Sequence, residues 1–303
     1  MKRIFVVNPK AGRGIGPRQM QMLEDFFRQR GEPFDAAIAS SRTDTVEQTR
    51  KSLRAGADQI VAVGGDGTLN AVANGFFEDG HPVRREATLA IARMGSGSDY
   101  FRGMCQEHAH DWRDIVLKHT ARPVDVVVVH RPGDPRQEPL YLLNMLGVGM
   151  SAEVVRRKQR LPTWLPRSLR YFVPTLPNLF YARVARIRLE ADGQAFEDDA
   201  VAVFVAKGTF AGGGMRFGGG VSLDDGQLDV TVVRPMSPWT MLVKTPRLYS
   251  GNFAGDPAIE KLKASRLRVT AEPALPAEFD GEFHDGTPLE ISVLPRAIQV
   301  CFP

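Results

Sequence analysis

Short apolar runs alternate with amphipathic stretches along the first part of the chain. The runs at 4–7, 34–39, 60–63 and 89–92 are predicted to be strands, because each is short, apolar and followed by turn residues. Helical patterns lie between them, as expected for an open sheet whose parallel strands are joined through helices. We therefore predict an α/β domain over residues 1–123, built on an open, mainly parallel sheet.

End signals mark two of the helices between these strands. The first is predicted over 17–30, with proline in its first turn and glycine after its end. The second is predicted to start at Asp44, which has the spacing of a capping box with Glu47, and to end at Gly56. Each helix precedes a predicted strand, which supports the alternating pattern.

In the second part of the chain the pattern changes. Strand-like runs recur at short spacing, and turn dipeptides such as Asp192-Gly193 and Asp225-Gly226 separate them. This spacing is typical of antiparallel strands joined by tight turns. We therefore predict a β-rich, sandwich-like second domain over residues 124–296.

One basic segment interrupts the β pattern. Residues 154–189 are predicted to form a proline-interrupted, partly helical insert without acidic residues. Its basic residues are Arg156, Arg157, Lys158, Arg160, Arg167, Arg170, Arg183, Arg186 and Arg188. Aromatic residues are interleaved with them, and this mixture suits an anionic membrane surface, where each basic residue contributes roughly 1 kcal/mol. Two alternatives stay open: a solvated helix pair that covers the β domain, or attraction of nucleic acid, although no recognised reading motif is present.

Composition limits the class of protein. Hydrophobic residues make up 43% of the chain and the net charge is +4, which fits a globular protein and does not require a nucleic-acid partner. The two cysteines, Cys105 and Cys301, exclude a disulfide framework and indicate a reducing cytoplasm. No apolar run has the length of a signal peptide or a transmembrane span. We expect a cytoplasmic protein with no transmembrane segment.

The clearest chemical signal is the turn Gly64-Gly65-Asp66-Gly67-Thr68, between a predicted strand and a helical pattern. Glycines let backbone N–H groups approach a ligand closely, and a helix N-terminus attracts phosphate. The Asp66 carboxylate repels a bare phosphate unless Mg2+ lies between them, or unless it bonds a sugar or the backbone. The turn therefore favours a metal–nucleotide complex. The alternative is a plain strand–helix turn with an aspartate cap.

Two further glycine-rich turns follow other predicted strands. Segment 8–14 comes after the first strand and contains Lys10 and Arg13, which can neutralise a phosphate. Segment 95–99 comes after the fourth strand. Ligands of open α/β sheets bind at the carboxyl ends of strands, so we expect the three turns to converge on one crevice.

Two acidic segments of the second domain are candidates for chemistry. Asp280-Gly281-Glu282 fits a hairpin turn, and alternatively one of its carboxylates acts as general base on the acceptor hydroxyl of a phosphoryl transfer. The turn at 223–229 offers carboxylate and carbonyl oxygens, so it is either a Mg2+ site or a solvated turn. The candidate metal ligands are Asp224, Asp225 and Gln227.

In their order along the chain, these segments resemble the diacylglycerol kinase catalytic-domain family of lipid kinases. The matching segments are Asn8-Pro9-x-x-Gly12, Gly64-Gly65-Asp66-Gly67-Thr68, Gly95-x-Gly97-x-Asp99, Asn144-x-x-Gly147-x-Gly149, Gly212-Gly213-Gly214, Asp225-Gly226-x-Leu228 and Asp280-Gly281-Glu282. The resemblance covers essentially the whole chain and implies that the last strand, 297–303, returns to the first domain. This sequence has Ser98 where the family usually has Asn, and Ala71 where it often has Glu.

The resemblance implies an ATP-dependent kinase that phosphorylates a lipid hydroxyl, with ATP and Mg2+ in a cleft between the domains. The implied cofactor-binding residues are Asn8, Pro9, Lys10, Gly12, Gly64, Gly65, Asp66, Gly67, Thr68, Gly95, Ser96, Gly97 and Asp99. The implied catalytic residues are Asp280, as the base, and Glu282.

The expected partner is a lipid at an anionic membrane surface, with peripheral membrane association and no nucleic acid. The resemblance implies that this lipid is diacylglycerol or a related lipid. The sequence does not choose the lipid or the oligomeric state. The alternatives are an NAD kinase-like phosphotransferase, which shares the Gly-Gly-Asp-Gly turn, and a non-catalytic nucleotide- or lipid-binding descendant.

Overall fold

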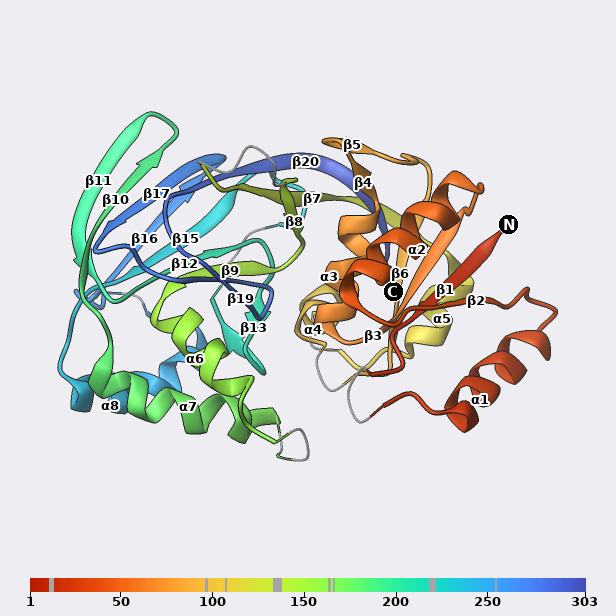
Figure 1. Cartoon of the computed structure of the whole chain (residues 1–303), viewed down its shortest axis with the longest axis horizontal. Helices are drawn as coiled ribbons and strands as arrows, with labels where there is room; N and C mark the ends of the chain where they lie inside the picture. The colour runs from red at the N-terminus through yellow and green to blue at the C-terminus, as the bar shows by residue number, and fades with distance from the viewer. Residues whose placement is uncertain are drawn as a thin grey trace. The chain divides into compact units, whose positions relative to one another are not determined.

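In the computed structural model, the chain divides into two compact units (Figure 1). Unit 1 comprises Met1–Val124 and Arg296–Pro303, and unit 2 comprises Asp125–Pro295. The structure describes residues 1–10, 14–95, 98–106, 108–132, 138–162, 165, 167–217, 222–253 and 255–303.

A parallel sheet forms the centre of unit 1. Its strands run in the order β2 (Asp35–Ile38), β1 (Arg3–Val7), β3 (Gln59–Gly64), β6 (Thr88–Arg93) and the last part of β20 (Leu289–Cys301). Each neighbouring pair is parallel. All 6 residues of β3 are buried, as expected for a central strand that is covered on both faces. The predicted α/β domain with an open, mainly parallel sheet is confirmed.

Helices connect these strands. They are α1 (Pro17–Arg28), α2 (Arg42–Arg54), α3 (Asp66–Gly75), α4 (Asp99–Met104) and α5 (Trp112–Lys118), with a small hairpin, β4 (Phe77–Glu78) and β5 (His81–Pro82), after α3. The predicted start of α2 at Asp44 is wrong, because Ser41 is the N-cap and its hydroxyl accepts a hydrogen bond from Asp44 N. The Asp44 carboxylate instead accepts hydrogen bonds from the main-chain N and hydroxyl of Ser40, the residue before the cap.

Two sheets form unit 2. The first is antiparallel, in the order β16 (Ile259–Ala264), β15 (Leu228–Val233), β12 (Ala202–Ala206), β9 (Met145–Gly149), β18 (Ala277–Phe279) and β19 (Glu282–His284). The second runs β11 (Gln194–Ala200), β10 (Ala185–Ala191), β17 (Arg266–Glu272) and β20, with β7 (Ala121–His130) paired to β20 and β8 (Leu140–Leu142) paired to β7. Through β20 these strands belong to the same 10-stranded sheet as the parallel strands of unit 1. A short hairpin, β13 (Phe210–Ala211) and β14 (Met215–Arg216), follows β12.

The two sheets of unit 2 enclose one hydrophobic core. Val203 and Val230 from the first sheet belong to the same buried cluster as Ile187 and Val269 from the second. The predicted β-rich, sandwich-like second domain is confirmed. Strand β20 contributes to both units, since Leu289 begins its pairing with β17 and its later residues pair with β6.

The last residues of the basic insert predicted at 154–189 belong to this sandwich. Arg186 and Arg188 lie on β10, on the exposed side of the strand. They form ion pairs with Asp199 at 3.6 Å and Glu197 at 3.1 Å, both on β11. These two arginines therefore neutralise acids of the neighbouring strand.

Three helices gather at one end of unit 2 (Figure 1). They are α6 (Met150–Lys158), α7 (Arg167–Tyr181) and α8 (Pro238–Ser250). α7 and the second half of α6 fall within the insert predicted at 154–189, whereas the sequence pattern predicts no helix at α8. Leu179 of α7 and Met241 of α8 share a buried cluster with Val201. Among the residues that the structure describes, none of the helices has the length and apolar character needed to cross a membrane.

Candidate active site

Three loops of unit 1 meet at one edge of its sheet. β1, β3 and β6 are parallel neighbours, so their carboxyl ends lie along the same edge. The loops that follow them start at Asn8, Gly65 and Met94, and they are the segments in which glycine-rich turns are predicted. This edge is where open α/β sheets bind their ligands.

Hydrogen bonds join the first loop to the second. Asn8 Nδ2 donates to Thr68 Oγ1 at 3.4 Å, and Asn8 N donates to Val63 O at 3.4 Å. Asn8 Oδ1 accepts a hydrogen bond from Lys10 N at 3.0 Å, which closes a turn within the first loop. The Asn8 side chain therefore holds two of the predicted nucleotide loops together.

The third loop packs so closely on the second that only glycine fits. Gly95 N donates to Gly64 O at 2.9 Å, and a Cβ on Gly95 would lie 2.4 Å from Gly65 N. A Cβ on Gly64 would lie 2.3 Å from Thr68 Oγ1. Gly67, by contrast, is exposed, and a Cβ there would meet no atom within 4 Å. Loop packing therefore explains why glycine is required at Gly64 and Gly95, whereas the backbone at Gly67 is exposed.

Asp66 links the second loop to the third. Its Oδ2 accepts a hydrogen bond from Asp99 N at 3.2 Å and its Oδ1 accepts one from Tyr100 N at 3.3 Å, in the first turn of α4. Ser98 is the N-cap of α4 but makes no side-chain cap bond, so Asp66 caps this helix from another loop. Negative charge is stabilising at a helix N-terminus. The sequence left three partners open for Asp66, namely Mg2+, a sugar and the backbone. The structure shows hydrogen bonds to the backbone.

The remaining predicted loop residues have local contacts. Pro9 O accepts a hydrogen bond from Ile15 N at 2.8 Å, and Lys10 Nζ donates to Ser40 O at 3.4 Å. Ala71, one of the departures from the family pattern, is buried on α3. Three predicted residues, Gly12, Ser96 and Gly97, lie outside the described residues.

Together the three loops form a candidate phosphate site. The exposed Gly67 lies in the first turn of α3, where the N–H groups of a helix have no intrahelical partners. Such N–H groups, together with the positive end of the helix dipole, attract phosphate. The arrangement can therefore hold the phosphates of a nucleotide against the backbone.

In unit 2, Asp280 and Gly281 form the turn of the β18–β19 hairpin. Both have positive φ, 47° and 87°, as favoured two-residue hairpin turns require. Asp280 N donates to Met145 O at 3.0 Å, and Asp280 Oδ1 accepts a hydrogen bond from Met145 N at 2.9 Å. The carboxylate is therefore held against the start of β9. Glu282, the second predicted catalytic residue, begins β19 and pairs with Phe279.

Glu278, two residues before Asp280, is a buried carboxyl that the sequence does not single out. It is 6% exposed, and its Oε2 accepts a hydrogen bond from Gly281 N at 2.8 Å. Burial raises the pKa of Glu278 to about 7, the Gly281 hydrogen bond and the Lys158 charge oppose this rise, and the Asp280 charge adds to it. Glu278 therefore titrates near neutral pH beside the predicted catalytic aspartate.

Asn144, the residue before β9, has a buried hydrogen-bond acceptor. Its Nδ2 donates to Phe210 O at 2.9 Å, and among the described residues its Oδ1 has no hydrogen-bond partner. A Cβ on Gly208 would lie 1.9 Å from this oxygen, so glycine is required there. An amide oxygen in this setting can accept a hydrogen bond from a hydroxyl group.

The turn predicted to hold a metal ion surrounds a lysine. Lys207 Nζ, with a fully buried side chain, lies 2.6 Å from Asp125 Oδ2 and 2.6 Å from Asp225 Oδ1. It also donates to Gln227 O at 3.0 Å. The ammonium group thus meets two of the three ligands that the sequence assigns to a metal.

The third assigned ligand, Asp224, accepts a hydrogen bond from the hydroxyl of Ser222. In the part of the chain that the structure describes, no group of three or more His, Cys, Asp and Glu side chains is arranged to hold a metal ion. A metal bound by Asp224, Asp225 and Gln227 stays a prediction.

Sequence reasoning missed both Glu278 and Lys207. Lys207 directly follows the apolar strand 202–206, and a lysine at that position is a signal for a buried ion pair. No comparable signal marks Glu278, because its burial depends on β9 and α6, which are distant in sequence.

The chain matches known protein domains along most of its length. Residues 2–129 match the diacylglycerol kinase catalytic domain, and residues 144–302 match the YegS C-terminal NAD kinase beta sandwich-like domain. A diacylglycerol kinase of Bacillus subtilis strain 168 is 26% identical over 307 residues, which cover 100% of this chain and 97% of that protein.

Solved structures share the fold. A diacylglycerol kinase from Bacillus anthracis strain Sterne aligns with a TM-score of 0.72 at 22% identity, over 100% of this chain and 97% of that one. Yeast NADH kinase complexed with NADH aligns with a TM-score of 0.52 at 11% identity, over 100% of this chain and 84% of that one. At these identities the likeness shows the fold alone.

Proposed function

We propose a reaction for this chain from one premise: it belongs to the family of lipid kinases that carry the diacylglycerol kinase catalytic domain and the YegS C-terminal domain. As a lipid kinase, it transfers a phosphoryl group to a hydroxyl acceptor. We propose ATP as the donor and diacylglycerol, or a closely related lipid, as the acceptor. The observation that carries the proposal is the set of three loops of unit 1, which hydrogen bonds hold together at the carboxyl ends of β1, β3 and β6.

These loops support a nucleotide in unit 1. The exposed Gly67 and the N-terminus of α3 offer backbone N–H groups to phosphate oxygens. Asn8 and Asp66 support this site indirectly, because their side chains form the hydrogen bonds that hold the loops together. A phosphate site assembled in this way is rigid before the nucleotide arrives, which lowers the entropic cost of binding.

The residues beside the loops fit a Mg2+ ion that binds together with the nucleotide. Kinases usually hold Mg2+ by one or two carboxylates plus substrate phosphates. Asp66 brings a carboxylate to the second loop, and Asp99, whose main-chain N donates to that carboxylate, begins α4 in the third loop. When bound, Mg2+ neutralises charge on the transferred phosphoryl group.

We assign Asp280 as the general base. The lipid hydroxyl gives its proton to the Asp280 carboxylate while its oxygen bonds to the γ-phosphorus, and the bond from that phosphorus to the ADP oxygen breaks. The hydrogen bond from Met145 N holds the carboxylate in one orientation, which supports this role. Glu282 lies on the next strand of the same hairpin and is proposed to assist at this site.

The acceptor is proposed to be reached at an anionic membrane surface. The basic residues of the insert support this, but not equally. Arg156 forms an ion pair with Glu153 at 2.6 Å, and Arg186 and Arg188 pair with strand acids. The exposed Arg160 therefore contributes more of the attraction than these three.

The test is phosphoryl transfer from radiolabelled ATP to a panel of acceptors. The panel contains diacylglycerol, a sphingoid base, phosphatidylglycerol, a polyprenol and NAD, each assayed with and without Mg2+. Label in diacylglycerol or another lipid supports the proposal. Label in NAD alone would replace it with an NAD kinase activity, which the fold shared with yeast NADH kinase allows. Label in no acceptor, with ATP bound, would favour a non-catalytic binding protein.

A further inference from the structure

Exposed hydrophobic side chains gather on α7 and α8. Leu169, Val173 and Phe180 of α7 are between 43% and 51% exposed, and Trp239 and Val243 of α8 are 67% and 78% exposed. The two helices lie side by side at one end of unit 2 (Figure 1). We call these five residues the α7–α8 face. Exposed apolar groups that cluster in this way mark an interaction site.

Helical spacing makes this face continuous. Leu169, Val173 and Phe180 are four and seven residues apart, which places them on one side of α7, and Trp239 and Val243 are four apart on α8. The Phe180 and Trp239 rings meet edge to face, with centroids 5.8 Å apart and an interplanar angle of 90°. This contact joins the two helices at the exposed surface.

Buried side chains elsewhere on the two helices hold them to the sandwich. Leu179 and Met241 are buried together there. Lys244 Nζ lies 2.6 Å from Asp256 Oδ1, and Arg247 binds Asp256 Oδ2 at 3.2 Å. The charged side of α8 is therefore occupied by Asp256, which leaves Trp239 and Val243 outward.

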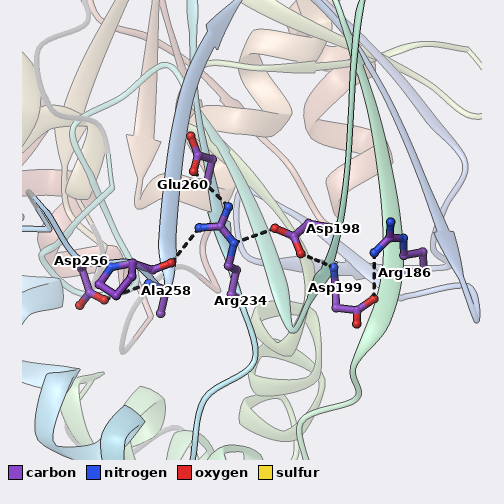
Figure 2. Close-up of polar contacts among 8 residues, drawn as sticks. Arg186, Asp198, Asp199, Arg234, Asp256, Ala258 and Glu260 are labelled. Atoms are coloured by element: carbon purple, nitrogen blue, oxygen red, sulfur yellow. Dashed lines mark hydrogen bonds and ion pairs between the residues drawn. The ribbon is translucent and has the colours of Figure 1, made fainter.

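Asp256 is itself part of a polar network on the sandwich (Figure 2). Its Oδ1 accepts a hydrogen bond from Ala258 N at 3.1 Å. Arg234 donates to Pro257 O at 2.8 Å and to Asp198 Oδ2 at 2.6 Å. The segment that anchors α8 is therefore tied to β11 and to the end of β15, so the apolar face is presented by a rigid support.

The charge around the face favours an anionic partner. Neither α7 nor α8 contains an acidic residue. Arg160, shortly after α6, and Arg183, shortly after α7, are both exposed. Apolar and aromatic side chains in the centre with arginine nearby are the composition of a surface that lies in the headgroup region of a bilayer.

We propose that the α7–α8 face inserts into the boundary between headgroups and acyl chains of an anionic bilayer. The proposal rests on the proposed function, since a lipid kinase has to reach an acceptor that resides in a bilayer. It differs from attraction by the basic insert alone, because Trp239 and Val243 lie outside that insert and because the apolar contact persists when salt screens the charges.

Vesicle sedimentation tests how much the apolar side chains of the α7–α8 face contribute to membrane binding. The vesicles contain phosphatidylcholine and phosphatidylglycerol, and the proteins are wild type, Val243→Gln and Val173→Gln. We expect each substitution to weaken binding by about tenfold, because a buried valine side chain contributes at least that factor to partitioning. The matched controls are Met22→Gln and Ile38→Gln, whose side chains are 62% and 53% exposed on unit 1, and they are expected to bind like wild type.

Fluorescence of Trp239 gives a second, independent readout. In the variant Trp112→Phe/Trp164→Phe, Trp239 is the remaining tryptophan. Its emission is expected to shift to shorter wavelength when vesicles are added, and Val243→Gln in this background is expected to reduce the shift. Unchanged emission, or equal vesicle binding by wild type and Val243→Gln, would overturn the proposal.

Two further outcomes separate this proposal from others. If wild type is a dimer by light scattering and Val243→Gln is a monomer, the face binds a second copy and the proposal fails. Activity on a short-chain, water-soluble diacylglycerol is expected to be equal in wild type and Val243→Gln. If no lipid is phosphorylated while vesicle binding follows the expected pattern, the kinase proposal fails and the bilayer contact stands.

Discussion

Asp280 combines two properties at the scale of a single residue. It is a turn residue with positive φ, and it is the proposed base, held by Met145 N through its Oδ1. Asparagine tolerates the same backbone conformation but accepts protons far less readily than a carboxylate. Substitution by asparagine therefore separates the two properties.

We predict that Asp280→Asn lowers turnover by about 10²-fold or more, the factor expected for loss of a general base, while ATP affinity stays close to that of wild type. Single-turnover phosphoryl transfer and ATP titration measure the two quantities. The matched control is Asp192→Asn, in the Asp192-Gly193 turn, where the aspartate has the same φ of 47° and lies on the β10–β11 hairpin. Near-normal turnover in Asp280→Asn would remove Asp280 from the mechanism.

Glu278 makes stability depend on pH. Burial raises its pKa from 4.5 to about 7, so between these values the folded protein holds a proton that the unfolded chain releases. The charged groups on the elements around it are Asp280 at the end of β18, Glu282 and His284 on β19, and Glu153, Arg156, Arg157 and Lys158 on α6. The contribution of the protonated Glu278 carboxyl to the free energy of unfolding is complete below pH 4.5 and is lost as the pH rises through about 7.

We predict that Glu278→Gln gains stability relative to wild type by about 2 kcal/mol when the pH rises from about 5.5 to 8, because each pH unit below the raised pKa corresponds to about 1.4 kcal/mol. Urea unfolding of both proteins at the two pH values measures the difference. The control is Glu290→Gln, at an exposed position of β20. A difference between Glu278→Gln and wild type that does not change with pH would contradict the buried, protonated carboxyl.

At the scale of elements, the loops after β3 and β6 act as one. We predict that Gly95→Ala weakens ATP binding by at least about tenfold, because the new Cβ would lie 2.4 Å from Gly65 N and would force the loops apart. Calorimetric titration with ATP measures the affinity. Gly16→Ala is the control, since a Cβ there meets its nearest neighbour, Gln19 Oε1, at 3.6 Å, an ordinary contact. Unchanged affinity in Gly95→Ala would show that the loops do not have to touch.

β3 and α8 differ in whether the local sequence pattern predicts them. The apolar run 60–63 within β3 was predictable, because a central strand is buried on both faces. α8 was not predictable, because Trp239 and Val243 stay exposed while Met241 is buried, and Pro246 lies inside the helix. Apolar residues on both sides of the helix erase the amphipathic period by which a surface helix is recognised.

Across unit 2, Lys207 joins the two sheets. It follows β12 of one sheet, and its partner Asp125 lies on β7 of the other. Asp125 Oδ2 also accepts a hydrogen bond from Gly226 N at 2.7 Å. Removal of one partner from a buried ion pair leaves the other charge uncompensated, which costs about 3–5 kcal/mol.

We therefore predict that Lys207→Met loses about 3–5 kcal/mol of unfolding free energy, whereas Lys263→Met, at an exposed position of β16, changes it little. Because the ammonium already meets Asp125 and Asp225, EDTA is expected to leave the melting temperature of wild type unchanged. Added Mg2+ is expected to restore part of the stability of Lys207→Met. A drop in the wild-type melting temperature with EDTA would instead support the metal site predicted from the sequence.

The order of the main strands and helices in unit 1, the β-rich character of unit 2 and the glycine turns that follow β1, β3 and β6 were predicted from the sequence alone, whereas the β4–β5 hairpin and α4 were not. These features were readable because burial of a short strand and the conformational freedom of glycine act over a few neighbouring residues. The resemblance of the whole set of motifs then pointed to lipid kinases, and the matches along both parts of the chain agree.

Which polar groups meet depends on how distant segments pack together. Asp66 caps α4 through Asp99 N, Asp280 binds Met145 N, and Lys207 binds Asp125, each across a long separation in sequence. The burial of Glu278 and the exposure of Val243 also depend on tertiary packing, because distant elements determine whether a side chain is covered. Hydrogen bonds and ion pairs act over a few ångströms, so their partners are set by packing between segments, which the local pattern of a sequence does not contain.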